Sequence, residues 1–94
     1  MSGGLTYAEV SGRQDEVFDV HAGGSTVPLV LAGVETLTDH GREGGSFRLN
    51  LRGPREPVLP QAIYRFTAEG FDEEIFIVPL GQNAEAAQYE AIFC

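Results

Sequence analysis

The sequence predicts a mainly β protein, in which residues 1–94 form a single antiparallel β-barrel or sandwich of about six strands with one short N-terminal helix. Several segments alternate apolar and polar residues, which is the period of a strand with one buried face. Glycine-containing turns separate these segments at short intervals. The chain is 43% hydrophobic, which suits one modest core and excludes a disordered chain.

The N-terminal segment carries a helix start signal. Thr6 followed by Glu9 is a capping-box pattern, in which each side chain satisfies a backbone N–H of the other residue. Gly12 is a typical residue to end such a helix. A short helix is therefore predicted over 7–11.

The next segments read as a hairpin. Residues 17–22 alternate as a strand, and the glycines of 23–25 indicate a tight turn. Residues 27–38 form a long β-prone run. Gly33 in its middle predicts a bulge or a bend, with a switch of the inward-facing parity there.

The centre of the chain predicts a second hairpin around a proline-rich link. Phe and Leu alternate with Arg and Asn over 47–52, which is typical of a half-buried antiparallel strand. Gly53 and Pro54 end this strand, because proline has no N–H to donate to a neighbouring strand. The next strand is predicted over 62–68, paired with the first.

The link itself is predicted to be stiff, since each proline, Pro60 included, restricts its own backbone and that of the residue before it. Its backbone polar groups need partners. The amide of Gln61 both donates and accepts, so Gln61 is predicted to hold the link, with Tyr64 packed beneath it. An outward Gln61 that contacts a ligand is the alternative.

The C-terminal third completes the sheet. Residues 69–74 are predicted to form an acidic turn, and residues 75–80 a strand that is apolar on both faces and covered on both sides for part of its length. Residues 81–87 read as a loop with helical tendency, and residues 88–94 as a last alternating strand.

Charge and composition restrict the partners. The net charge is −8, from 14 acidic and 6 basic residues, which argues against nucleic acid and anionic membranes. Apolar runs are far shorter than the ~20 residues of a membrane span. The N-terminus lacks a signal pattern, so a cytoplasmic location is expected, with signal-independent export left open. Cys94 is the single cysteine and excludes an internal disulfide.

The chemistry-bearing residues do not predict an enzyme. His21 and His40 are not at metal-ligand spacing, so no metal is expected. Residues 23–26 lack the lysine of a phosphate-binding loop, and no cofactor is expected. The carboxylates of 72–74 are interpreted as a solvated turn rather than an acid/base pair.

An arginine-rich face is the leading candidate for binding. If residue 50 pairs with residue 65, one outer face carries Arg48, Asn50, Arg52 and Arg65, with Arg55 in the link above it. Guanidinium groups make paired bonds to carboxylates, so this face is predicted to bind an acidic partner or anion. The alternative is a solvated face balanced by Glu35, Glu73 or Glu90.

Cys94 is the second candidate. An exposed terminal thiol is able to tether another chain, and the alternative is a terminal residue without a role.

Four strings carry a family resemblance: F-R-L-N-L-R-G-P, L-P-Q-A-I-Y, I-F-I-V-P-L-G and Y-E-A-I-F. Their combination resembles a small bacterial family known only as a domain of unknown function. The resemblance implies an association with phage-tail-like collar proteins and a structural or assembly role. It brings no catalytic residue. The family pattern ends in Asn where this chain has Cys94, so the resemblance implies nothing for that thiol.

These observations predict a non-enzymatic β-domain that acts through protein contacts, as a subunit or accessory of a larger, phage-tail-like assembly. Its partner is another protein or a second copy. The alternative is a β-barrel that binds a small ligand or an anion, and an enzyme is the weakest class.

Overall fold

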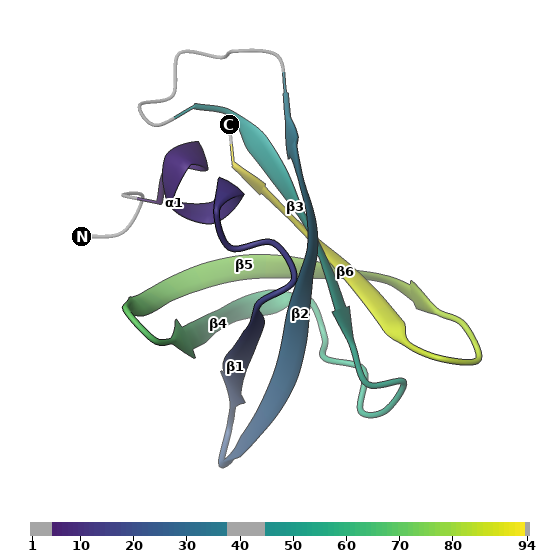
Figure 1. Ribbon diagram of the computed structural model, residues 1–94. Helices are drawn as coiled ribbons and strands as arrows, with labels where there is room; N and C mark the ends of the chain where they lie inside the picture. Colours follow the sequence, from purple (N-terminus) through teal and green to yellow (C-terminus); the bar gives the residue numbers. More distant parts are fainter. Residues whose placement is uncertain (1–4, 38–44, 94) are drawn as a thin grey trace.

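Six antiparallel strands close into a barrel in the computed structural model, which describes residues 5–37 and 45–93 (Figure 1). The pairing order around the barrel is β1-β2-β3-β6-β5-β4, and β4 pairs with β1 to complete the ring. The elements are α1 (Tyr7–Ser11), β1 (Val17–Ala22), β2 (Ser25–Thr36), β3 (Phe47–Gly53), β4 (Ala62–Ala68), β5 (Phe71–Gln82) and β6 (Ala87–Phe93). The predicted fold class is confirmed, and the closed ring selects a barrel over a sandwich.

The helix α1 forms as its capping pattern predicts. The N–H of Glu9 donates to Oγ1 of Thr6 at 3.2 Å, and the N–H of Thr6 donates to Oε1 of Glu9 at 2.8 Å. Val10 is buried against the barrel, and the Tyr7 ring lies 6.2 Å from that of Phe47 on β3. The helix therefore covers one end of the barrel, beside the end of β6 (Figure 1).

The first hairpin and its bulge also agree with the prediction. Gly23 has φ of +64° in the turn between β1 and β2, a left-handed conformation that favours glycine. The register of β2 against β3 shifts between Leu31 and Gly33, which is a β-bulge. Before the bulge Leu31 faces Leu51, and after it Val34 faces Leu49, so the inward parity switches there.

The predicted pairing of 47–52 with 62–68 is wrong. Strand β3 pairs with β2 and β6, whereas β4 pairs with β1 and β5. The link between them does not make a tight turn, because its prolines cannot donate to a ladder. Instead Leu59 enters the core and the chain continues to a strand elsewhere in the ring.

Two tyrosines hold this link. The buried N–H of Leu59 donates to the hydroxyl of Tyr89 at 2.9 Å, and the hydroxyl of Tyr64 donates to the carbonyl of Pro60 at 2.7 Å. Gln61 is exposed. The prediction that a buried Gln61 amide fastens the link is therefore wrong, because a core tyrosine reaches the backbone from inside the barrel.

The end of β3 is tightly packed against its neighbours. A Cβ added at Gly53 would lie 2.3 Å from Cδ2 of Leu29, a fully buried side chain that has little freedom to move. Pro54 follows directly and is half-buried. Gly53 is therefore required by the packing, since only a residue without a side chain fits where β3 leaves the barrel.

The C-terminal strands differ from the prediction in two ways. The turn between β4 and β5 is shorter than 69–74, because β5 begins at Phe71 and only Glu69 and Gly70 form the turn. Gly70 has φ of +72° there. The outer face of β5 is also uncovered in this chain, and Phe76 is 48% exposed. The last strand forms as predicted up to Phe93, and Cys94 lies outside the described residues.

Replacing Tyr89 by Phe tests the core anchor of the link. The ring stays and the hydroxyl is lost, which leaves the buried N–H of Leu59 without its acceptor. We expect the free energy of unfolding to fall by about 1–3 kcal/mol, measured by urea titration followed by circular dichroism. Tyr64→Phe is the matched control and should cost less, because water can replace its exposed bond to Pro60. Equal losses in the two variants would contradict the anchor.

Candidate functional site

The predicted arginine face does not form as one surface. Arg48 and Arg52 lie on β3, whereas Arg65 lies on β4, which does not pair with β3. Arg48 on β3 lies between two carboxylates: it bonds to Glu35 of β2, and its Nη1 is 3.8 Å from Glu90 of β6. Asn50 also donates to Glu35, at 3.2 Å. The hydrogen bond from Arg48 is the main cause that lowers the pKa of Glu35. Of the predicted balancing acids, Glu35 and Glu90 take that role.

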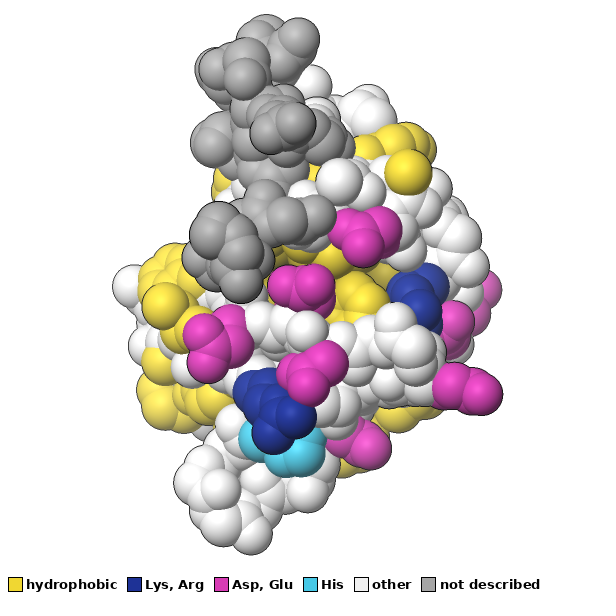
Figure 2. Space-filling model, turned by 90° about the vertical axis from the view of Figure 1, so that its left-hand side faces the viewer, with side chains coloured by type: hydrophobic (Ala, Val, Ile, Leu, Met, Phe, Trp, Pro, Cys, Tyr) yellow, Lys and Arg dark blue, Asp and Glu magenta, His cyan; other side chains and the backbone are white. Residues whose placement is uncertain are grey.

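Arg65 lies on β4, away from the other candidates. Its Nε and Nη2 donate to the two carboxylate oxygens of Asp72 at 2.9 and 2.7 Å. This paired bond is the main cause that lowers the pKa of Asp72, and the charge of His21 on β1 contributes a little. Figure 2 shows a face on which basic, acidic and histidine side chains lie side by side. A dark-blue basic side chain lies directly above the cyan histidine, and magenta carboxylates lie beside it. Asp72, and not the predicted Glu73, balances Arg65.

Arg52 differs from the other described arginines. Arg13 pairs with Glu16, and Arg55 donates to the carbonyl of Asn83 at 3.2 Å and lies 3.8 Å from Glu56. Within the part of the chain that the structure describes, Arg52 makes no ion pair and no side-chain hydrogen bond. Among the arginines that the structure describes, the guanidinium of Arg52 is therefore available to bind a partner.

Arg52 stands beside a depression that two bulges create. Ala32 is the extra residue of the bulge in β2, and Leu80 is the extra residue where the register of β5 against β6 shifts between Pro79 and Gly81. A bulge re-aims a side chain out of the regular sheet. The depression has a volume of about 170 Å³ and is lined by Ala32, Asn50, Leu51, Arg52, Leu80, Gln88 and Tyr89.

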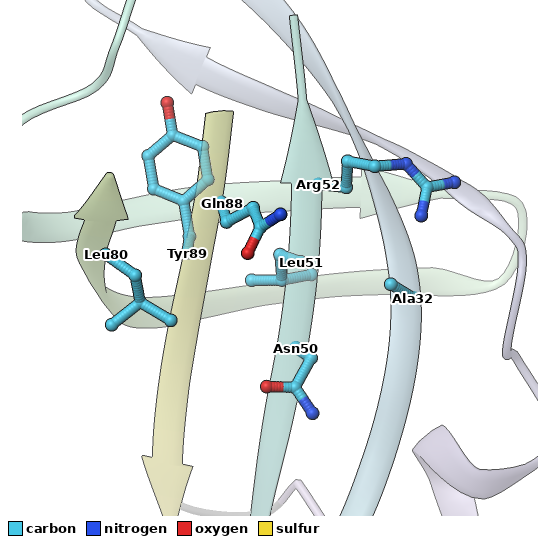
Figure 3. Close-up of a pocket in the computed structure, with 7 residues that line it drawn as sticks. All are labelled: Ala32, Asn50, Leu51, Arg52, Leu80, Gln88 and Tyr89. Carbon is cyan, nitrogen blue, oxygen red and sulfur yellow. The ribbon is translucent and has the colours of Figure 1, made fainter. Parts of the chain in front are cut away.

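The close-up in Figure 3 shows how these side chains lie. Leu80 stands on one side and Ala32 on the other, with β6 and β3 between them. The Gln88 amide lies between β6 and β3, the Asn50 amide lies on β3, and Arg52 extends across β2, away from Gln88. Gln88 is directly opposite Arg52 in the register of β3 with β6. The depression therefore offers two amides between Leu80 and Ala32, with the Arg52 side chain at its edge.

Two further depressions adjoin this one. One of about 250 Å³ shares Leu80 and Gln88 with the bulge-flanked depression, and one of about 310 Å³ shares Arg52. The second is also lined by Glu85, which makes no ion pair with Arg52.

An apolar outer face adjoins this surface. Ile63 on β4 is directly opposite Phe76 on β5, and the two are 64% and 48% exposed. Leu80 on β5 and Ile92 on β6 are about half exposed, at 55% and 50%. A group of exposed apolar side chains on neighbouring strands is typical of an interaction surface. Leu80 is one of these exposed apolar residues and also lines the depression.

The described residues do not assemble a metal site. No group of three His, Cys, Asp or Glu side chains that could hold a metal lies within residues 5–37 and 45–93. His21 interacts with the hydroxyl of Thr67 at 2.9 Å. His40 and Cys94 fall outside the described residues, so their predicted roles stay predictions. No helix in the described part of the chain is long and apolar enough to cross a membrane.

Sequence reasoning missed three residues of this surface: Ala32, Leu80 and Gln88. A signal was present for two of them, because each bulge is followed by a glycine that interrupts an apolar run. Gly33 was interpreted in this way, and Gly81 in V-P-L-G carries the same signal. Gln88 has no such signal, since only the pairing of β6 with β3 places it opposite Arg52.

Comparison with known proteins gives one match. The family model described as a domain of unknown function, DUF6916, matches residues 5–93. No curated protein and no solved structure matches the chain. The matched range runs from the residue before the helix cap to the end of β6, so the family domain and the barrel coincide.

The pair of Arg65 and Asp72 predicts a pH effect. A carboxyl whose pKa is lower in the folded state stabilises the fold above its unfolded pKa, and this stabilisation is lost as the pH falls through the folded value. Arg65→Gln should therefore raise the pKa of Asp72 toward its ordinary value and weaken the acid dependence below about pH 4. Carboxyl-carbon NMR measures this titration. Arg13→Gln is the control, and an unchanged Asp72 in Arg65→Gln would refute the coupling.

Proposed function

The chain belongs to the family of the domain of unknown function DUF6916, and we propose that it is a non-enzymatic β-domain that acts by binding another protein. The observation that carries this proposal is the apolar outer face of β4, β5 and β6. Ile63 and Phe76 lie directly opposite each other there with about half or more of each side chain in water. Burial of such side chains against a partner is favourable at about 25 cal/mol per Å².

The closed ring supports contact through side chains. Pairing of β1 with β4 occupies the backbone groups that an open sheet would offer to another chain. A partner therefore meets the outer surface, which carries the apolar face and the depression that Leu80 and Arg52 line.

Net charge favours a different chain over a second copy. Each copy carries a net charge of −8, and two acidic copies repel each other. A small domain that binds another chain fits the role of a subunit or accessory in a larger assembly. The phage-tail-like setting that the family resemblance implies is an assembly of this kind.

Two alternative functions have less support. A ligand inside the barrel would need space, and inward side chains fill it: Val20, Leu29, Phe66, Ile77 and Tyr89 are each at most 1% exposed. An enzyme would need a base or nucleophile beside its substrate. The residues that line the bulge-flanked depression include no carboxylate, imidazole or thiol.

The test removes apolar surface without adding charge. The double variant with Ile63→Ser and Phe76→Ser should fold as the wild type does by circular dichroism, because both side chains point outward. We expect the immobilised wild type to retain one specific protein from an extract of the source cells, identified by mass spectrometry. The double variant should lose it, by a factor of about ten or more.

A conservative control accompanies it. The variant with Ile63→Val and Phe76→Leu keeps most of the apolar area and should retain the same protein. Retention by the serine double variant would show that this face is not the contact. Sedimentation velocity provides the other outcome, since a wild-type dimer that the serine variant dissociates would make a second copy the partner and refute the choice of a different chain.

A further inference from the structure

We propose that the bulge-flanked depression is a recognition site for the carboxylate of an aspartate or glutamate side chain on an extended segment of the partner. The inference rests on the proposed function, since the segment belongs to the bound protein. It goes further in assigning the chemistry of what is bound and the residues that bind it: Arg52, Gln88 and Asn50, between Ala32 and Leu80.

The two bulges make this a built feature of the barrel. A regular antiparallel surface is flat across neighbouring strands, and a bulge adds one residue that stands out of it. Here one bulge lies on each side of the β3–β6 pair, and the extra residue of each, Ala32 and Leu80, lines the same depression. The two extra residues lie on opposite sides of the β3–β6 pair, with Leu80 beyond β6 and Ala32 on β2 (Figure 3).

The free guanidinium of Arg52 selects an acidic group. The other described arginines each form an ion pair with a carboxylate. Arg52 forms none among the described residues, so its planar guanidinium is available for a paired bond to a carboxylate. Glu85 lines the adjoining depression on the other side of Arg52 and makes no ion pair with it.

The amides select a peptide segment. Asn50 donates from its Nδ2 to Glu35 and keeps its carbonyl oxygen as an acceptor. Gln88, opposite Arg52, makes no side-chain hydrogen bond within the described residues and offers both a donor and an acceptor. A segment in extended conformation presents N–H and C=O groups in alternation, which suits these two amides.

The volume of this depression suits a single side chain. Pockets that hold drug-sized molecules or cofactors have volumes of about 300–1,000 Å³. The bulge-flanked depression has about 170 Å³, enough for one acidic side chain. Apolar contact with Leu80 and Ala32 then accounts for the methylene groups of that side chain, while its carboxylate reaches Arg52.

The test uses a blocked dipeptide, acetyl-Leu-Glu-methylamide, and its neutral match, acetyl-Leu-Gln-methylamide. Nitrogen-15 NMR follows the side-chain signals of Arg52 (Nε–H) and Gln88 (amide) during titration. We expect the acidic probe to shift both signals along a saturating curve and the neutral probe to shift neither. Arg52→Gln should weaken binding of the acidic probe about tenfold or more, because it removes a charge-assisted paired bond.

Matched variants make the outcome decisive. Arg55→Gln changes the net charge by the same amount a few residues away and should leave the affinity unchanged. Equal weakening by Arg55→Gln, equal binding of the neutral probe, or no saturable shift would overturn the proposal. Inorganic phosphate that competes as well as the acidic probe would also overturn it, in favour of a phosphate site. The Ile63 and Phe76 serine variant should still bind the probe, so this proposal and the proposed function fail separately.

Discussion

The pairing of β1 with β4 closes the sheet into a ring, and the other features of the molecule depend on this closure. A short sheet closes only if its strands bend, and bulges supply the curvature. The two long strands, β2 and β5, each contain one. Closure therefore accounts for the bulges, and the bulges in turn lift Ala32 and Leu80 out of the regular surface to form the walls of the depression.

Closure also determines where the protein can act. The inward side chains form the buried core, and each strand has a paired neighbour on both sides around the ring. Recognition must use outward side chains. Most of the outer surface is polar, as expected of a half-buried sheet, whereas β5 carries Phe76 and Leu80 on its outer face. The apolar run over 75–80 predicted a strand with both faces buried. The core buries its inner face, and we propose that a partner buries its outer face.

The arginines illustrate how pairing assigns roles to identical side chains. Arg48 and Arg65 each meet a carboxylate on a neighbouring strand, and their ion pairs stabilise the local surface only modestly, because they are exposed. Arg52 faces Gln88 across the β3–β6 pair and so has no carboxylate opposite it. A difference in one cross-strand neighbour thus separates a surface ion pair from a candidate binding residue.

The sequence by itself determined the local features: the capped helix over 7–11, the strand segments and their inward faces, the turn at Gly23 and the bulge at Gly33. These depend on residues close together in the chain, through side-chain alternation, capping and backbone freedom. The tertiary structure alone decided that β3 pairs with β6 and not with β4, that Arg65 lies apart from Arg52, and that Tyr89 rather than Gln61 holds the link. Alternation states which face of a strand is buried and carries no information on which strand lies beside it. That choice is made by long-range packing and by closure of the ring, where residues far apart in the chain meet.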